Sequence, residues 1–320
     1  MNSVDLVRQK AGITVKNGSK PFLKTLIGQK QLVFMSVPIL LYIILFNYVP
    51  TVGWTMAFQN FQPAKNLFKQ TWVGLYNFKF LFTDPDFYRD LRNTLCMSSI
   101  NIVLSFAAAI ILALLLNEVK NMLFKRTIQT ISYLPHFLSW VIVSSLVVNT
   151  ISYDGIFNVL LVHLGIIAKP VVWLGQGNYF WGIIGVTNVW KEVGWNTIIY
   201  LAAMAAIDPA LYEAAVMDGA SRFQKMRYIT LPGIKTTFVI LLIMSIGWIM
   251  EAGFEAQYLL KNGMNIDFAE TIDLYVIKYG FQQSNFSLAT AAGMFKSVIN
   301  ITMLLFANFI AAKVGEERLI

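Results

Sequence analysis

Residues 213–219 read Glu213-Ala214-Ala215-Val216-Met217-Asp218-Gly219, and after nine further residues the chain continues with Ile229-Thr230-Leu231-Pro232. This stretch is polar and charged, and long apolar runs flank it on both sides. A hydrophilic segment between two such runs is typical of a loop that joins two membrane spans.

The composition of the 320 residues indicates a polytopic membrane protein. Hydrophobic residues make up 57% of the chain and charged residues only 13%, whereas soluble domains carry about 25% charged residues. The single cysteine, Cys96, excludes an intramolecular disulfide, and its apolar surroundings predict a packing role. His136 and His163 are far apart and have no Cys or H-E-x-x-H partner, so no metal site is predicted.

Six apolar segments have the roughly 20 residues that a span requires. They are residues 32–56, 94–117, 127–151, 180–207, 236–258 and 288–312. Backbone groups cannot stay unpaired in lipid, and runs of this length favour helices over barrel strands. The predicted fold class is therefore an all-α membrane protein with six transmembrane helices, the first being retained rather than cleaved as a signal peptide. Proline is expected to kink the third helix at Pro135.

The distribution of Lys and Arg predicts the orientation. With the N-terminus in the cytoplasm, the inner segments carry fifteen Lys and Arg residues and the outer segments carry eight. Because cytoplasmic loops carry an excess of these residues, both termini and the loop at Glu213 are expected to be cytoplasmic. The same bias accounts for the net charge of +8, so no nucleic-acid partner is implied.

Local signals in the Glu213 loop predict two short helices joined by a glycine turn. Asp208-Pro209 supplies a capping carboxylate and a proline at the first helical position. Gly219 is expected to end the first helix in the left-handed conformation. Ser221 and Gln224 have the spacing of a capping box, which would start the second helix.

Two further features complete this loop. Leu211, Ala214 and Ala215 share one face of the first helix, and this face of small residues allows another protein to approach closely. Pro232 is expected to break the chain before the next span. Local physics alone leaves two interpretations open, namely a surface hairpin without a partner and a docking element.

The spacing E-A-A-x-x-x-G-x(9)-I-x-L-P resembles the coupling loop, or EAA motif, of ABC importer permeases. Further segments are similar to those of sugar-importing permeases, and the likeness is nearest to the LplB-type branch, which serves oligo- and polysaccharide uptake. These segments are Tyr-Leu-Pro-His-Phe at 133–137, Trp-Lys-Glu-Val-Gly-Trp at 190–195, Ile-Ile-Tyr-Leu-Ala-Ala at 198–203 and Ile-Asp-Pro-Ala-Leu-Tyr at 207–212. The resemblance extends over nearly the whole chain from about Gln31.

The resemblance implies a carbohydrate permease in the bacterial cytoplasmic membrane, with a basic segment at 1–30 and a permease domain at 31–320. Within that domain, the type-1 core would cover about 92–312 and the coupling loop about 208–233. The implied partners are a second homologous permease, two ATP-binding subunits and an external solute-binding protein. The residues expected to couple to an ATPase are Glu213, Ala214, Ala215, Asp218, Gly219, Ile229, Leu231 and Pro232.

No cofactor is expected in this chain. No G-x-x-x-x-G-K-[ST] loop occurs in the sequence, so we expect the chain to hydrolyse no ATP and not to be an enzyme. ATP and Mg²⁺ would be bound by the partner ATPase subunits.

Polar and aromatic residues within the spans are candidates for a substrate cavity. They are Trp190, Lys191, Trp195, Asn196, Tyr200, Glu251 and Glu255. The charged members either bind ligand hydroxyls or pair internally, and the aromatic members either stack on sugar rings or pack. Glu251 and Glu255 are expected on one helix face. Glu251 is also expected to pair with Lys296, which lies at equal depth on the last span.

Two other functions are compatible with part of the sequence. An ion-coupled secondary transporter would explain the charges within the spans, but it gives no reason for the Glu213 loop. A membrane enzyme would need a nucleophile–base or metal constellation, which the sequence lacks. The outer segments 59–90, 152–178 and 259–287 are long for connectors. They form either a docking surface for an external partner or an amphipathic cover at the membrane interface.

Overall fold

The computed structural model describes residues 29–313 of the chain. Nearly all of the basic segment expected at 1–30 lies outside these residues, as does the C-terminus from residue 314. The chain forms two compact units, whose boundary falls between Trp54 and Thr55. Each unit is described by itself below.

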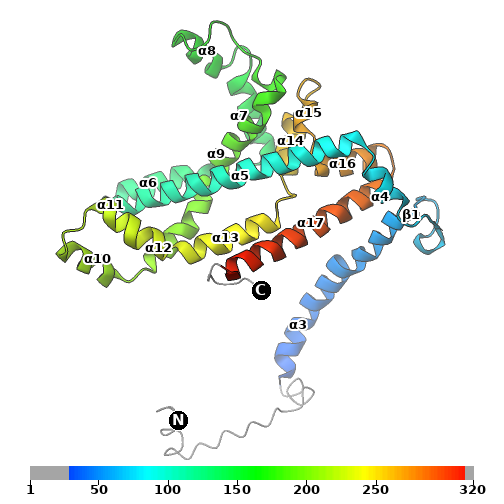
Figure 1. Ribbon diagram of the computed structural model, residues 1–320, viewed down its shortest axis with the longest axis horizontal. Coiled ribbons are helices and arrows are strands. Elements are labelled where there is room, and N and C mark those ends of the chain that lie inside the picture. Colours follow the sequence, from blue (N-terminus) through cyan, green and yellow to red (C-terminus); the bar gives the residue numbers. More distant parts are fainter. Residues whose placement is uncertain (1–28, 314–320) are drawn as a thin grey trace, which may run out of the picture. The chain divides into compact units, whose positions relative to one another are not determined.

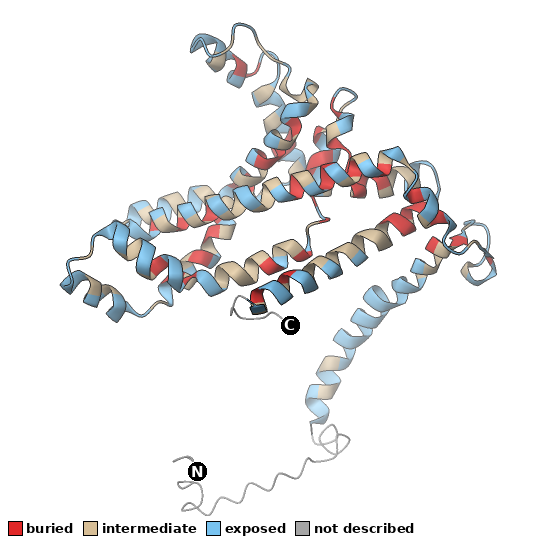
Figure 2. Ribbon diagram, in the orientation of Figure 1, coloured by how far each residue is buried: buried red, intermediate tan, exposed pale blue. Residues whose placement is uncertain are grey.

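The first unit is one apolar helical run. It contains the α-helix α3 (Lys30–Ile43), the π-helical turn η1 (Ile44–Tyr48) and the start of the 3₁₀ segment η2 (Val49–Phe58). No residue of α3 or η1 is buried, and Figure 2 shows this run almost wholly in the colour of exposed residues. Its length and hydropathy suffice to cross a membrane, so its apolar side chains suit contact with lipid or with another helix.

The second unit is helical apart from one short antiparallel ladder. Strand β1 (Gln59–Asn60) pairs with β2 (Thr71–Trp72), so that Gln59 lies opposite Trp72. Three helices are much longer than the rest: α5 (Pro85–Glu118), α9 (Gly177–Ala205) and α17 (Phe286–Lys313).

Shorter elements connect these helices. In chain order they are η3 (Leu67–Lys69), α4 (Tyr76–Leu81), α6 (Met122–Tyr133), η4 (Leu134–Phe137), α7 (Trp140–Ile151), α8 (Ile156–His163), η5 (Trp173–Gly175), α10 (Pro209–Met217), α11 (Arg222–Lys225), η6 (Met226–Thr230), α12 (Leu231–Gly233), α13 (Lys235–Gly247), α14 (Phe254–Leu260), α15 (Ile266–Ala269), α16 (Ile272–Ile277) and η7 (Lys278–Gln282).

Four helical stretches within residues 29–313 are long and apolar enough to span a membrane. Two bent pairs raise this number to six if each pair counts as one span: α9 with α10, and the segment Arg222–Gly233 with α13. The helical membrane fold expected from the sequence is therefore confirmed. The first, second, fourth and sixth runs lie close to their expected positions.

The third and fifth runs differ from the prediction. The expected helix over 127–151 is broken, because α6 ends in the 3₁₀ turn that contains Pro135 and α7 begins only at Trp140. The membrane-length stretch is instead Trp140–His163. The expected helix over 236–258 is interrupted as well, because α13 ends at Gly247 and α14 starts at Phe254.

Close helix packing positions the candidate site. Helix α5 runs along α9, and α13 runs along α17 (Figure 1). Gly194 permits a close approach of α9 to α6, since a Cβ there would lie 2.1 Å from the Ser132 carbonyl oxygen. One buried cluster joins α5, α9 and the start of α13 through Ala109, Tyr200 and Ile234. The helices around the polar cavities described next are thus fixed by direct packing.

Candidate functional site

The Glu213 loop has the local structure that its sequence predicts. The Asp208 carboxylate accepts a hydrogen bond from the Ala210 amide (2.9 Å), and Pro209 is the first residue of α10. The chain then bends by 69° between α9 and α10. Figure 1 shows α10 and α11 together at one end of the second unit. The loop therefore projects from the bundle as a helix–turn–helix.

The turn at Gly219 has the hydrogen bonds of a Schellman motif. The Ala220 amide donates to the Ala215 carbonyl (2.8 Å), and the Gly219 amide donates to the Val216 carbonyl (3.1 Å). Gly219 has a φ of +75°, which residues with a side chain adopt only at a cost. A Cβ at Gly219 would meet no atom within 4 Å. Glycine is thus required for its backbone conformation and not for space.

The second arm of the loop starts with the expected capping box. The Gln224 amide donates to Ser221 Oγ (3.3 Å), and the Ser221 amide donates to Gln224 Oε1 (2.7 Å). The expected break at Pro232 is displaced. Pro232 lies within the short helix α12, and the backbone changes direction at Ile234, by 54° before α13.

The residues expected to couple to an ATPase are mostly accessible. Glu213, Ala214, Asp218, Gly219, Leu231 and Pro232 are exposed, whereas Ala215 and Ile229 are half-buried. The Glu213 side chain makes no hydrogen bond or ion pair with any residue in the described part of the chain. The same loop exposes several large apolar side chains, which include Leu211, Val216, Met217, Phe223 and Tyr228. This mixture of an unpaired carboxylate and apolar groups is suited to binding another protein.

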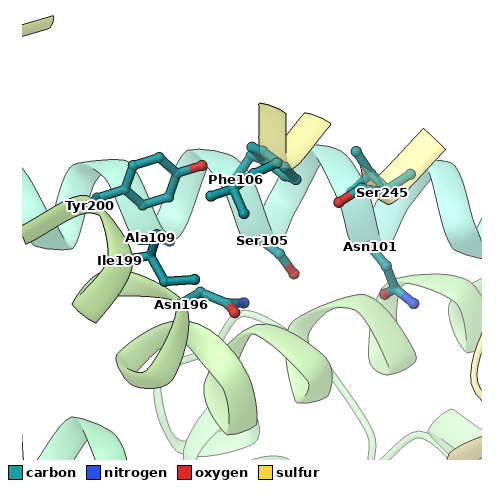
Figure 3. A pocket seen from close by; sticks show the side chains of 10 residues that line it. Asn101, Ser105, Phe106, Ala109, Asn196, Ile199, Tyr200 and Ser245 are labelled. Carbon is teal, nitrogen blue, oxygen red and sulfur yellow. The ribbon is translucent and has the colours of Figure 1, made fainter. Parts of the chain in front are cut away.

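The first of three polar cavities lies between α5, α9 and α13. It has a volume of about 230 Å³, and its lining includes Asn196 and Tyr200, two of the seven residues predicted for a substrate cavity. Figure 3 shows the amide of Asn196 near the hydroxyl of Ser105, with the Asn101 amide on the same side of α5. The Asn101 Oδ1 atom is buried and finds no hydrogen-bond partner among the described residues. Asn101 thus carries a buried acceptor whose hydrogen bond is not formed within the described part of the chain.

Two further cavities continue from the first. The second, of about 260 Å³, shares Asn101 with the first and adds Asn188 and Glu255. The third, of about 460 Å³, shares Glu255 and Trp140 with the second and adds Lys191. We call the linings of these three cavities the polar path. The Glu255 carboxylate is exposed to the path and forms no ion pair with any residue between 29 and 313.

The remaining aromatic candidates lie elsewhere. Trp190 lines a separate, mainly apolar cavity of about 730 Å³, together with Trp173 and Tyr179. Trp195 lines none of these four cavities; its indole stacks on His136 with ring centroids 4.4 Å apart and planes within 5°. Trp190 and Trp195 therefore do not line the cavity that contains Asn196 and Tyr200, although the sequence predicted one cavity for all four.

His136 and Glu192 form a polar cluster beside the path. His136 Nδ1 is 2.6 Å from Glu192 Oε2, and Lys191 Nζ is 3.1 Å from Glu192 Oε1. Lys191 also donates to the His136 carbonyl (2.7 Å). The cluster connects η4 to α9 and pairs Lys191 with the Glu192 carboxylate. Lys191 thus contributes mainly structure at the rim of the third cavity.

Glu251 lies in the interruption between α13 and α14, and the expected common helix face with Glu255 does not exist. The expected ion pair with Lys296 is present at 3.3 Å, although Lys296 Nζ is closer to Asp273 Oδ1, at 2.6 Å. Glu251 lines none of the four cavities. Glu251 is therefore held by Lys296 of α17 and does not line the polar path.

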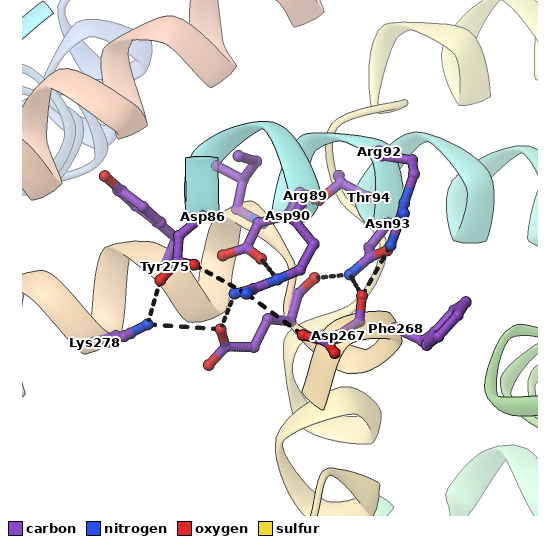
Figure 4. A network of polar contacts seen from close by, with 12 residues as sticks. Asp86, Arg89, Asp90, Arg92, Asn93, Thr94, Asp267, Phe268, Tyr275 and Lys278 are labelled. Atoms are coloured by element: carbon purple, nitrogen blue, oxygen red, sulfur yellow. Dashed lines mark hydrogen bonds and ion pairs between the residues drawn. The ribbon is translucent and has the colours of Figure 1, made fainter. Parts of the chain in front are cut away.

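A second polar network was not foreseen from the sequence (Figure 4). The Arg89 guanidinium donates to Asp86 and Glu270, at 2.9 and 2.7 Å, and lies 3.2 Å from the buried Asp90. Lys278 pairs with Asp86 at 3.0 Å. The network fastens the start of α5 to α15 and α16. The only signal in the sequence was the spacing of residues 86, 89 and 90 just before the span.

The hydroxyl of Tyr275 fixes the same end of α5. It donates to Asp84 Oδ2 (2.7 Å), and Tyr279 donates to the same oxygen (3.0 Å). Burial, together with this hydrogen bond, raises the pKa of the Tyr275 phenol above its ordinary value. The phenol therefore remains a donor to the residue that caps α5.

Comparison with known proteins identifies the family. Residues 102–316 match the family described as "Binding-protein-dependent transport system inner membrane component". The chain belongs to this family. It is accordingly a multi-pass protein of the bacterial plasma membrane and a transport component without catalysis of its own, and the family supports a solute-binding protein among its partners.

Individual relatives of this transport component are similar over most of its length. The chain is 46% identical to the polygalacturonan/rhamnogalacturonan transport system permease protein YteP of Bacillus subtilis (strain 168), over 96% of this chain and 95% of that protein. It is 41% identical to protein LplB of the same organism, over the full length of both. A crystal structure of a bacterial ABC transporter involved in the import of the acidic polysaccharide alginate has a chain with 38% identity and a TM-score of 0.85, covering 92% of this chain and 99% of that one.

Proposed function

We propose that this chain forms one part of the translocation channel of an ATP-driven importer for oligosaccharides, with uronic-acid oligosaccharides as the first class to test. The similarity to proteins named for polygalacturonan, rhamnogalacturonan and alginate supports this substrate class. The observation that carries the proposal is the exposed α10–Gly219–α11 loop, because neither a secondary transporter nor a membrane enzyme requires a docking element for an ATPase.

Cytoplasmic ATPase subunits are the proposed binding partners of this loop. α10 would enter a cleft on an ATPase, where the free Glu213 carboxylate pairs with basic or N–H groups and the apolar side chains around it bury area. Two ATP-binding subunits, a second homologous permease and an external solute-binding protein would complete the importer. ATP and Mg²⁺ would bind to the ATPases. Both chain termini would face the cytoplasm, as the loop does.

The polar path is the proposed contribution of this chain to the sugar route. Its amides and hydroxyls, at Asn101, Ser105, Asn188 and Asn196, can exchange hydrogen bonds with saccharide hydroxyls as these lose their water. The unpaired Glu255 carboxylate adds a strong acceptor for hydroxyls. Amide and hydroxyl contacts that are individually weak also allow release, which tight binding would prevent. Transport then consists of alternating access, driven by movement of the coupling loop.

Reconstitution tests the proposal. The chain, its co-expressed homologous permease, the ATPase subunits and the solute-binding protein would be placed in proteoliposomes with labelled oligogalacturonate. We expect co-purification of the ATPase and ATP-dependent uptake, reduced at least ten-fold by Asn196→Ala but not by Trp190→Ala. Uptake that is driven by an ion gradient without ATP, or a chain that never co-purifies with an ATPase, would contradict the proposal.

A further inference from the structure

The two arms of the coupling loop are each joined to the bundle at an angle. α10 is bent by 69° from α9, and the segment Arg222–Gly233 is bent by 54° from α13. A bend between helices lacks the continuous backbone hydrogen bonds that make a single helix stiff. Without further contacts, each arm could pivot about its own joint, and a push on α10 would not reach α13.

The two joints are packed against each other. Ile207 follows α9 and Gly233 precedes α13, and a Cβ on Gly233 would lie only 2.5 Å from Ile207 Cδ1. Ile234 is buried in the cluster that also contains Tyr200 and Met204. The base of the loop is therefore closed by apolar contact.

A hydrogen bond closes the loop again further out. Tyr212 Oη lies 2.9 Å from Thr230 Oγ1. Tyr212 belongs to the middle of α10, and Thr230, only 3% exposed, is the last residue of η6. The bond thus links the helix that carries Glu213 to the arm that leads into α13.

We propose that Tyr212 and Thr230 are positioning residues, whose hydrogen bond makes the two arms move as one body. The inference rests on the proposed docking of α10 on an ATPase. Closed at the base and across the middle, the loop transmits a displacement of α10 to both α9 and α13. These two helices line the first cavity of the polar path. With the bond lost, α10 still binds the ATPase, but ATP is hydrolysed with less sugar transported.

The test measures sugar transported per ATP hydrolysed in proteoliposomes of the complete importer. Tyr212→Phe and Thr230→Val each remove one hydroxyl and keep the shape of the side chain. We expect each to lower the ratio about five-fold, the factor that corresponds to the ~1 kcal/mol of a neutral hydrogen bond. The double variant should fall no further, because both changes remove the same bond.

Two control variants isolate the hydroxyl pair. Thr230→Ser keeps the hydroxyl and should restore a ratio near that of the unmodified chain. Tyr42→Phe removes the hydroxyl of a tyrosine in α3, outside the coupling loop and 62% exposed, and should have no effect. Co-purification of the ATPase should stay unchanged in all five variants, and the Tm in detergent should fall by no more than the few degrees that the loss of ~1 kcal/mol produces.

The outcomes distinguish a failure of the proposed Tyr212–Thr230 link from a failure of the function on which it rests. If the unmodified chain fails to co-purify with the ATPase, the proposed function is wrong. The unmodified chain could also assemble and transport while Tyr212→Phe and Thr230→Val keep the sugar-per-ATP ratio within about two-fold of its value. In that case only the proposed role of the Tyr212–Thr230 bond is wrong. A fall in Tm or in ATPase association with an unchanged sugar-per-ATP ratio would also overturn this role, because the bond would then only stabilise the loop.

Discussion

Replacement of Gly219 tests how the coupling loop is built. The backbone at Gly219 has a φ of +75°, and a Cβ there would meet nothing within 4 Å. The whole cost of a side chain is therefore the cost of the left-handed conformation, about 1–2 kcal/mol for an ordinary residue and more for a β-branched one. The equilibrium constant for the correctly directed α10 should then fall at least about five- to thirty-fold in Gly219→Val.

The assay combines a pull-down of the ATPase with sugar-stimulated ATP hydrolysis. We expect both to decline in the order unmodified chain, Gly219→Asn, Gly219→Ala, Gly219→Val, because asparagine tolerates the left-handed region. The spans should remain folded in every variant, since the loop projects from the bundle.

Gly74 provides a matched control. It has a φ of +60°, and a Cβ there would also meet no atom within 4 Å, but it lies between β2 and α4. Gly74→Val should therefore carry the same backbone strain without loss of ATPase binding. Full assembly and full stimulated hydrolysis in both Gly219→Val and Glu213→Ala would refute the coupling role of the loop.

Three further predictions concern the bundle. Gly194→Ala should lower the Tm in detergent, at a cost of about 1–3 kcal/mol or more, because its Cβ would lie 2.1 Å from the Ser132 carbonyl oxygen. Gly182→Ala on the same helix has open space around its Cβ and should leave the Tm unchanged. Equal Tm values for the two variants would contradict the close packing at Gly194. Lys296→Met should destabilise the protein more than Glu251→Gln, because Lys296 also pairs with Asp273 at 2.6 Å. Combining Asp273→Asn with Lys296→Met should restore part of the lost stability. Additive losses in denaturant unfolding would argue against the Lys296–Asp273 pair. Trp195→Ala should lower stability by about 1 kcal/mol through loss of its stacking on His136 while ATP-dependent uptake per folded transporter is retained; a selective loss of uptake would return Trp195 to the sugar route.

The coupling loop could be predicted almost completely because its structure is encoded locally. Asp208-Pro209, Gly219 and the Ser221–Gln224 box each act within a few residues. The error at Pro232 is equally local: Pro232 follows the π-helical turn η6 within the helical segment Arg222–Gly233, and the bend occurs two residues later.

The interruption at residues 248–253 could not be predicted from apolar periodicity. The apolar run continues through Ile249, Met250 and Ala252, while the break depends on contacts from another helix: the Met250 amide donates to Asn300 Oδ1 (3.1 Å), and Glu251 pairs with Lys296. Gly253, with a φ of +91°, was the one local signal.

The polar network at the N-terminal end of α5 depends on contacts that are distant in sequence. Arg89 and Glu270 are 181 residues apart, and charge counting placed Arg89 simply in an outer segment. For a related reason, only some of the residues that line the cavities could be predicted. Polar residues of α9 could be recognised, but which side of α9 faces α5 is decided by packing, and this separates Asn196 and Tyr200 from Trp190 and Trp195.

Site-specific photo-crosslinking tests the central claim, that α10 contacts an ATPase, most directly. A benzophenone amino acid would replace Met217, the 86% exposed last residue of α10, or Phe68, which is 79% exposed in the segment 59–90 that is expected to lie outside. In the transporting complex we expect position 217 to give an adduct with the ATPase subunit and position 68 to give none. An ATPase adduct from position 68, or none from position 217 in a complex that still transports, would contradict both the coupling role of α10 and the orientation of the chain.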